Sequence, residues 1–526
     1  GKDMTHWLKQ LAQAWDCQDD GGGARPYPGL GQMHQFVRSL VPRPVRHILP
    51  RTLKRVVVVG GGPTGLFCAD RLRHHFEVTV VDPKDFFEFT PSVLRAVADP
   101  SHLSRITFNY REVLENELGV EFLLGQASKV DMVHSATGAG RGTVNVRSSS
   151  GEGKLHFDYC ILAVGVSNGL WKPRLSGETI TGIGAQGLAA AAGAEELTLD
   201  GRRATLRSVR DRIANSRGVV VVGAGLVGVE MAAELVHFFP RLRVTLVDGA
   251  PDVLPQLGEG ARQYARQWLQ QHNVSLRLNK PFAPEFLGAD EVVLSCVGTK
   301  ARGAGLLPER TSLRSNGQIR VNQHMQVLYR PSVGDRADEV GMGAAGSLGG
   351  SASSSMGEPE PGSAASSSMS EPTLGGAASS VSQEPPQGGA EVGRGSPRMP
   401  GGGAFQPFGQ GRIFAVGDAA SVEGVPTAQM IYHGEEMASV AVANIEAAEG
   451  VISPFQLSQN ANRELEPGTP FLCCTSLGPL DGMFSTQTEL IATGTLAAIQ
   501  KQMIEATKMG ALKGDLACSA LWYPVH

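Results

Sequence analysis

Two glycine-rich turns hold the residues best suited to chemistry in this chain. The first, Gly60-x-Gly62-x-x-Gly65, lies between a β-branched run and a helical pattern, and Asp82 ends the next β-branched run. Such glycines permit a tight turn, a close approach of the backbone to pyrophosphate and close helix packing, while an acidic residue about 20 positions later accepts from ribose hydroxyls. The positive end of the helix then faces the phosphates. The spacing predicts a dinucleotide site.

A second turn repeats this pattern as Gly223-x-Gly225-x-x-Gly228, and Asp248 ends the following predicted strand. A carboxylate at Asp248 accepts from a free 2′-hydroxyl and repels a 2′-phosphate, and residues 249–251 supply no arginine to hold one. The second site is therefore predicted to take NADH in preference to NADPH. Two complete patterns serve either two exchanging substrates or one tightly held cofactor and one substrate.

A third segment favours a held flavin. Residues 414–418 end a predicted strand with Gly417 and Asp418, and a helix is predicted to start near Pro426. A carboxylate there can accept from a ribityl chain, and a helix N-terminus at the pyrimidine edge stabilises the negative charge that reduction places on a flavin. Taken singly, Asp418 fits an ordinary turn equally well.

Composition limits the other functions. The 526 residues, with 41% hydrophobic side chains, suit two or three globular domains, and the net charge of -4 gives no basic field, so nucleic acid is not an expected partner. No apolar run approaches the roughly 18 residues that cross a bilayer. The cysteines are odd in number and lack C-x-x-C spacing, which fits a reducing compartment, and no metal site is predicted.

These segments, in this order, resemble the two-dinucleotide flavoprotein superfamily that includes glutathione reductase. The resemblance rests on the two glycine patterns and on residues 161–165 and 415–418. Within that superfamily, residues 86–91 and 427–433 are similar to type II NADH dehydrogenases. Residues 219–234 are equally similar to the apoptosis-inducing-factor-like family with its ferroptosis-suppressor quinone reductase branch.

The resemblance implies an α/β fold with two Rossmann-like dinucleotide-binding domains and a small α+β C-terminal domain. Residues 331–410, rich in Gly, Ser and Pro, are expected to form a disordered insertion because they have few apolar side chains to bury. Gly1 and Thr5 fit a loose myristoylation pattern, and whether Gly1 is the native N-terminus stays open. The predicted parts are an N-terminal extension (1–50), an FAD-binding domain in two pieces (51–180, then 311–330 with 411–450), an NAD-binding domain (181–310), the insertion (331–410) and a C-terminal domain (451–526). Within the C-terminal domain, a strand is predicted at residues 471–475 and a helix at residues 488–508.

The resemblance also assigns the cofactors, with FAD on the first domain and NADH on the second. Asp82 would bind the adenosine ribose of FAD and Asp418 its ribityl chain, while Glu230 would lie near the nicotinamide ribose and Asp248 at the adenosine ribose of NADH. The FAD set is Gly60, Gly62, Pro63, Thr64, Gly65, Asp82, Pro83, Thr90, Pro91, Ala163, Gly165, Gly417, Asp418, Thr427, Ala428 and Gln429. The NADH set is Gly223, Gly225, Leu226, Val227, Gly228, Glu230, Asp248 and Gly298.

The implied activity is an FAD-dependent NADH:quinone oxidoreductase that pumps no protons. Gln429 and His433 are its candidate catalytic residues at the quinone, although type II dehydrogenases have a second glutamine where this chain has His433. A disulfide reductase is not expected, because only Cys68 follows the first glycine turn closely. An NADH-sensing scaffold like apoptosis-inducing factor and a soluble reductase of another small acceptor remain alternatives.

The expected location is the mitochondrial inner membrane, as a peripheral protein, with a plastid or another membrane surface as the alternative. Peripheral membrane contact and a homodimer or larger assembly stay open.

Overall fold

The computed structural model describes residues 54–133, 141–167, 171–175, 194–288, 290–303, 305–308, 311, 313–330, 405–451, 463–468 and 471–522. The chain divides into two compact units, residues 1–329 with 406–526 and residues 330–405. The described helices and strands all lie in the first unit. The predicted N-terminal extension and residues 331–404 of the predicted disordered insertion lie outside the described residues.

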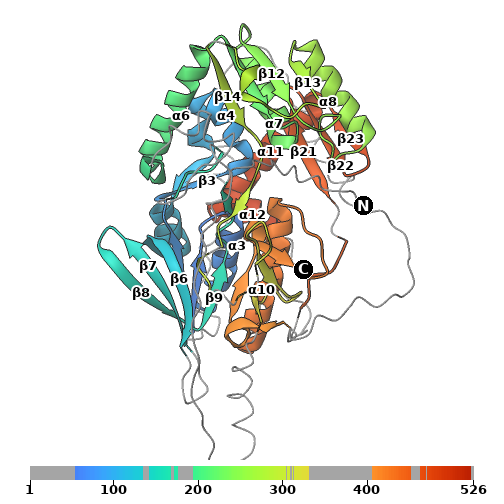
Figure 1. Cartoon of the computed structure of the whole chain (residues 1–526). Coiled ribbons are helices and arrows are strands. Elements are labelled where there is room, and N and C mark those ends of the chain that lie inside the picture. Colours follow the sequence, from blue (N-terminus) through green and yellow to red (C-terminus); the bar gives the residue numbers. More distant parts are fainter. Residues whose placement is uncertain are drawn as a thin grey trace, which may run out of the picture. The chain divides into compact units, whose positions relative to one another are not determined.

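The first dinucleotide-binding domain is built on a five-stranded parallel sheet of order β19-β9-β1-β2-β5. Strand β9 and helix α3 of this domain are labelled in Figure 1. Residues 56–59 in its central strand are at most 3% exposed, as expected for a parallel sheet covered on both faces. The elements are β1 (Arg55–Val59), α3 (Pro63–Leu72), β2 (Glu77–Asp82), β5 (Glu121–Leu124), β9 (Tyr159–Leu162) and β19 (Ile413–Ala415). Strand β19, encoded after the second domain, pairs with β9 from before it.

Shorter elements extend this domain. A small sheet of β3 and β4 flanks helix α4, and a three-stranded antiparallel sheet β6-β7-β8 is inserted between β5 and β9. Neither sheet is predicted from the sequence, because their strands are marked by no glycine turn of recognisable spacing. The bounds are β3 (Phe86–Glu88), α4 (Val93–Ala98), β4 (Thr107–Asn109), β6 (Gln126–Val133), β7 (Arg141–Ser148) and β8 (Gly151–Phe157).

The second dinucleotide-binding domain has a four-stranded parallel sheet of order β13-β12-β11-β14. Its elements are β11 (Gly218–Val222), α7 (Leu226–Phe238), β12 (Arg243–Val247), α8 (Glu259–Gln271), β13 (Ser275–Arg277) and β14 (Glu291–Ser295). The preceding helix α6 (Leu199–Ala214) and the antiparallel pair β10 (Val166–Ser167) and β15 (Lys300–Ala301) connect the chain between the two domains. Both predicted strand-turn-helix-strand units are therefore confirmed.

The C-terminal region differs from the prediction in one element. A helix is predicted from residue 488 to 508, but β23 (Leu490–Thr493) occupies its start and pairs with β22 (Gly482–Thr486). Helix α11 (Thr495–Leu512) begins only after Gly494, whose φ of 75° suits glycine and separates strand from helix. The rest of the region is β21 (Leu472–Ser476), which pairs with β22, and α12 (Leu516–Trp522). Within the described part of the chain, no helix has the length and apolar character needed to span a membrane.

Helix α10 (Ile431–Ala448) packs on α3 and closes the first domain. It begins at Ile431, later than the predicted start near Pro426. Two short strand pairs precede it in the sequence: β16 (Ile319–Val321) with β20 (Ala420–Val422), and β17 (Leu328–Tyr329) with β18 (Gln406–Pro407). The paired chain therefore resumes at Gln406, inside the range predicted for the insertion.

Glu446 on α10 is a carboxyl group in the core of this helix pair, 2% exposed. Burial raises its pKa to about 7, against an opposing effect of Arg71. The folded state therefore keeps a proton that the unfolded chain releases near pH 4.5, so the stabilisation present below pH 4.5 is lost as the pH rises through about 7.

Replacing Glu446 by Gln should remove this pH dependence. Relative to the native protein, Glu446→Gln should gain about 3 kcal/mol in the free energy of unfolding between pH 5 and pH 8. Denaturant titrations at both pH values measure this, with Glu436→Gln on the exposed side of α10 as control. An equal pH profile for native protein and Glu446→Gln would contradict the expectation.

Candidate functional site

The first glycine turn has the geometry that a phosphate-binding loop needs. Gly60 has a φ of 106°, and a Cβ added to Gly65 would lie 1.9 Å from the Gly60 carbonyl oxygen. A Cβ on Gly62, in contrast, would meet nothing within 4 Å. Helix α3 starts beside this open space with no side-chain cap, so its first amides can bind an anion. The turn therefore fits the pyrophosphate of a dinucleotide.

The second glycine turn repeats these features. Gly223 also has a φ of 106°, and a Cβ on Gly228 would lie 1.7 Å from the Gly223 carbonyl oxygen. Beside Gly225 the nearest atom is 4.0 Å away, and α7 likewise starts without a side-chain cap. Leu226 and Val227, in the first turn of α7, are half-buried. The second turn fits a second dinucleotide.

Each predicted ribose acid also braces its own turn. Asp82 accepts the Gly61 amide on Oδ2 (2.7 Å) and the amide two residues later on Oδ1 (2.9 Å). Asp248 accepts the Ala224 amide on Oδ2 (2.6 Å) and, again, the amide two residues later on Oδ1 (2.7 Å). A carboxylate has about four acceptor positions, so both side chains keep capacity for ribose hydroxyls. The assignment of these acids to the ribose remains a prediction.

Tyr110 is hydrogen-bonded to the first glycine turn. The sequence alone does not predict this role. Its hydroxyl donates to the Gly61 carbonyl oxygen (2.6 Å), and its ring packs in the core at 5.0 Å from the Phe122 ring centroid. Burial and the negative charge of Asp82 raise the pKa of Tyr110 well above its usual range, so the phenol stays a donor. No spacing rule links a tyrosine so far along the chain to the glycines.

The predicted ribityl acid lies beside the first turn. Gly417 has a φ of 70°, and a Cβ there would lie 3.0 Å from Thr64 Oγ1, so Asp418 is held next to the start of α3. Lys172 Nζ lies 3.7 Å from Asp418 Oδ2, and burial lowers the pKa of this lysine while Asp418 opposes the shift. Gly165, with a φ of 64°, borders the same lysine. The structure thus brings together four predicted residues and adds Lys172.

The segment predicted to face the flavin ring is shaped by His433. Its Nδ1 accepts the Ala428 amide (3.0 Å), so the neutral ring carries its proton on Nε2, which donates to the Tyr432 hydroxyl (2.8 Å). That hydroxyl also accepts the Leu472 amide (3.0 Å). These bonds hold Ala428 in the loop before α10, which begins at Ile431. His433 is 6% exposed and positions this loop, while its predicted role at a quinone remains a prediction.

Gln429 lies at one of the contacts between the two dinucleotide domains. The Thr299 hydroxyl of the second domain donates to Gln429 Oε1 of the first (3.4 Å). Thr299 follows Gly298, which has a φ of 78° and open space where a Cβ would point. Both Gln429 and Gly298 are exposed, so a ligand can reach them. The predicted NADH and flavin residues therefore approach each other at this contact.

The other predicted residues lie around these elements. Thr90 and Pro91 form a short turn directly before α4, while Ala163 follows β9 and Pro83 follows β2. Glu230, on α7, accepts the Ser476 amide (2.7 Å) and is paired with Lys501 of the C-terminal region. Across the described residues, no cluster of His, Cys, Asp and Glu could hold a metal ion.

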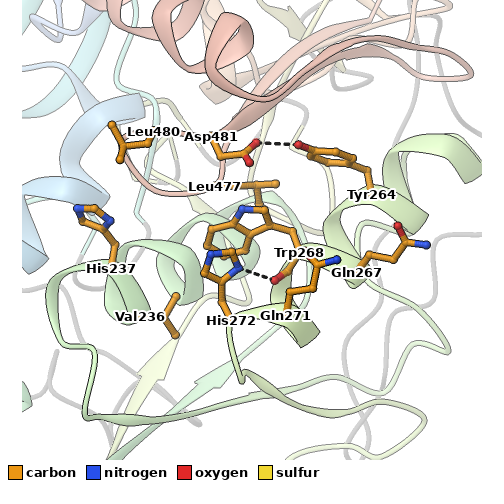
Figure 2. A pocket seen from close by; sticks show the side chains of 10 residues that line it. All are labelled: Val236, His237, Tyr264, Gln267, Trp268, Gln271, His272, Leu477, Leu480 and Asp481. Carbon is orange, nitrogen blue, oxygen red and sulfur yellow. Dashed lines mark hydrogen bonds between the residues drawn. The ribbon is translucent and has the colours of Figure 1, made fainter.

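A pocket of about 330 Å³ lies away from both glycine turns (Figure 2). Trp268 and His272 stack in it with ring centroids 3.7 Å apart, and the Tyr264 hydroxyl donates to Asp481 (2.9 Å). The pocket borders α8 and the C-terminal part of α7, at the opposite end of that helix from Gly225. None of the residues predicted from sequence lines it.

Comparison with known proteins matches this geometry. The family model for pyridine nucleotide-disulphide oxidoreductases matches residues 54–337. The chain belongs to this family. It is therefore an NAD(P)H-dependent flavin oxidoreductase. Cys68 on α3 is buried and burial raises the pKa of its thiol, so the described part of this turn and helix offers no reactive cysteine pair.

Individual relatives are distant. The chain is 25% identical over 311 residues to human ferroptosis suppressor protein 1, which covers 54% of this chain and 74% of that protein. The sulfide:quinone oxidoreductase of Aquifex aeolicus shares the fold, with a TM-score of 0.53, 16% identity and coverage of 88% and 92%. NDH2 of Plasmodium falciparum, solved with NADH, also shares the fold, with a TM-score of 0.54 and 10% identity. The match covers 90% of this chain and 99% of that one. The predicted fold and superfamily are confirmed.

The close approach at Gly65 should make that position intolerant of any side chain. A Cβ in Gly65→Ala would strike a backbone oxygen that cannot rotate away, so the variant should lose at least about 2 kcal/mol of stability and most bound flavin. Thermal unfolding and flavin absorbance measure both. Gly153→Ala, where a Cβ meets nothing within 4 Å, is the control and should change stability by less than about 0.5 kcal/mol.

Removing the Tyr110 hydroxyl should weaken the flavin site without disturbing the fold. Tyr110→Phe deletes the bond to Gly61, worth about 1 kcal/mol, and should raise the flavin dissociation constant about fivefold. Tyr264→Phe removes a comparable bond to Asp481 far from this turn and should leave flavin binding unchanged. Fluorescence titration of the apoprotein gives both constants, and equal effects of the two variants would refute the role of Tyr110.

Proposed function

We propose that the chain is an FAD-dependent NADH:quinone oxidoreductase that pumps no protons. When bound, the flavin supplies a hydride acceptor that passes two electrons on to the quinone. The observation that carries the proposal is the contact between Thr299 and Gln429, where a loop of one dinucleotide domain meets a loop of the other. A hydride transfer needs its donor and acceptor held at such a junction, and the chain contributes mainly this orientation.

FAD is favoured over FMN by the construction of the first site. Its glycine turn and Asp82 form a complete dinucleotide pattern, and FMN has no adenosine ribose for that acid to bind. Asp418, beside Lys172 and Thr64, is available to the ribityl chain. NADH is favoured at the second site because Asp248 presents a carboxylate where NADPH would place its 2′-phosphate.

Quinone is the proposed acceptor because residues 427–433 resemble type II NADH dehydrogenases and because Cys68 stands alone on α3. Electrons must then leave the flavin directly. Large apolar side chains exposed in the C-terminal region support contact with a membrane that supplies the quinone, with the mitochondrial inner membrane as the proposed location. These side chains are Leu480, Ile491, Leu496, Ile499, Leu516 and Leu521.

Anaerobic stopped-flow absorbance near 450 nm tests the function. NADH should bleach the flavin at about 1 s⁻¹ or faster, NADPH more slowly, and a soluble ubiquinone analogue should restore the absorbance at a comparable rate. Bleaching without recovery by any quinone would overturn the quinone reductase and favour an NADH-sensing protein like apoptosis-inducing factor. Purified protein without flavin absorbance, even after incubation with FAD, would overturn the flavin assignment.

A further inference from the structure

One turn of helix α7 brings the three parts of the molecule together through charges. Glu230 and Glu234, four residues apart, lie on the same side of the helix and are buried. Arg95, four residues after Pro91 in the first domain, binds Glu234 (Nη2 to Oε1, 2.9 Å). Lys501, on α11 of the C-terminal region, binds Glu230. Glu234 of the NAD-binding domain is thus paired with a cation of the first domain, and Glu230 with a cation of the C-terminal region.

Ser476 at the end of β21 ties the two pairs together. Its amide donates to Glu230 Oε1 (2.7 Å), and its hydroxyl lies 3.4 Å from Glu234 Oε1. Glu230 therefore accepts hydrogen bonds from the Ser476 amide and from the Lys501 ammonium, both of which belong to the C-terminal region. A carboxylate held by an ammonium and an amide has a fixed position and a compensated charge.

The two ion pairs lie where the isoalloxazine ring of the flavin and the nicotinamide ring of NADH are expected. A narrow cavity is lined by Pro91, Arg95, Glu230, Ser476 and Lys501 together. Pro91 is the predicted neighbour of the isoalloxazine, and Glu230 is predicted near the nicotinamide ribose. Two carboxylates and two cations leave no net charge among the two pairs. Burial lowers the pKa of the Lys501 ammonium, but Glu230, with smaller contributions from Cys474 and Cys473, raises it above its usual value.

We propose that Lys501 is a positioning residue for the reaction with NADH, which fixes the Glu230 carboxylate and cancels its charge beside the flavin. The inference rests on the proposed function and deepens it. According to this proposal, the C-terminal region takes part in the reduction of the flavin by NADH, in addition to any contact with the electron acceptor. Without the lysine, a buried negative charge would disfavour the anion formed when the flavin is reduced.

Variants of Lys501 test this proposal by two measurements. The first is the flavin midpoint potential, measured by equilibration with a reference dye, and the second is the NADH concentration that half-saturates flavin bleaching. Lys501→Met should lower the potential, shifting the reduced-to-oxidised ratio at least tenfold (about 30 mV for two electrons), and should raise the half-saturating NADH concentration about tenfold. Lys513→Met removes the same charge from the exposed end of α11 and should change either quantity less than twofold. Equal potentials for the two variants would overturn the proposal.

The double variant Glu230→Gln with Lys501→Met separates charge from shape. It should return the potential to the native value because no unpaired charge remains, while NADH binding stays weak. A potential that stays low would overturn the charge mechanism. If Lys501→Met fails to fold, the double variant and Lys501→Arg carry the test: both should have the native potential, and a tenfold shift in either would overturn the proposal.

The potential needs no NADH, so failure of the inference and failure of the proposed function are distinguishable. A native protein that NADH does not bleach would overturn the function. A native protein that NADH bleaches normally, with Lys501→Met indistinguishable from Lys513→Met, would overturn only the role of Lys501.

Discussion

The structure depends on a contact that only glycine permits, between the first turn of a helix and the carbonyl oxygen that precedes it. At Gly65 and again at Gly228, a side-chain carbon would lie less than 2 Å from that oxygen. Its absence lets α3 and α7 sit directly against the ends of β1 and β11. The helix amides then face the open space beside Gly62 and Gly225, where a phosphate can be bound. The bracing by Asp82 and Asp248 holds each turn in this geometry.

The features that sequence predicts are those written locally in the chain. The glycine turns, their helices and the acids that follow occupy short stretches with clear periodicity, and all of them form as predicted. Strand β23 is misread as helix because Leu490–Thr493 shows no decisive period, and only pairing with β22 and the turn at Gly494 settle its conformation. A four-residue segment is too short for its periodicity to distinguish strand from helix, and pairing with a neighbouring strand decides its conformation.

The same limit applies to the site. Tyr110, Lys172 and Lys501 act on partners far away in sequence, so their type alone reveals nothing. His433 shows the converse, because a residue type suited to proton transfer serves here to hold the amide of Ala428. Residue type indicates what a side chain is able to do, whereas its neighbours decide which ability is used.

The first domain is completed late in the chain. Strand β19 pairs with β9 across nearly half of the sequence, and α10 then packs on α3. Contacts of such large sequence separation carry a high entropic cost and form slowly. The proposed flavin site, which includes Asp418 and Thr64, therefore forms only after the second domain has been synthesised.

The pairing of β17 with β18 has a consequence for how the protein can change over time. Tyr329 faces Gln406, and the Cα atoms of such facing residues are about 5 Å apart, so the chain leaves and re-enters the domain at one place. A segment attached at two adjacent points imposes almost no geometric demand on its host, and its length costs entropy only logarithmically. Evolution is thus free to enlarge or replace the intervening residues. An engineer could graft a reporter domain with neighbouring termini at the same hairpin and leave both glycine turns untouched.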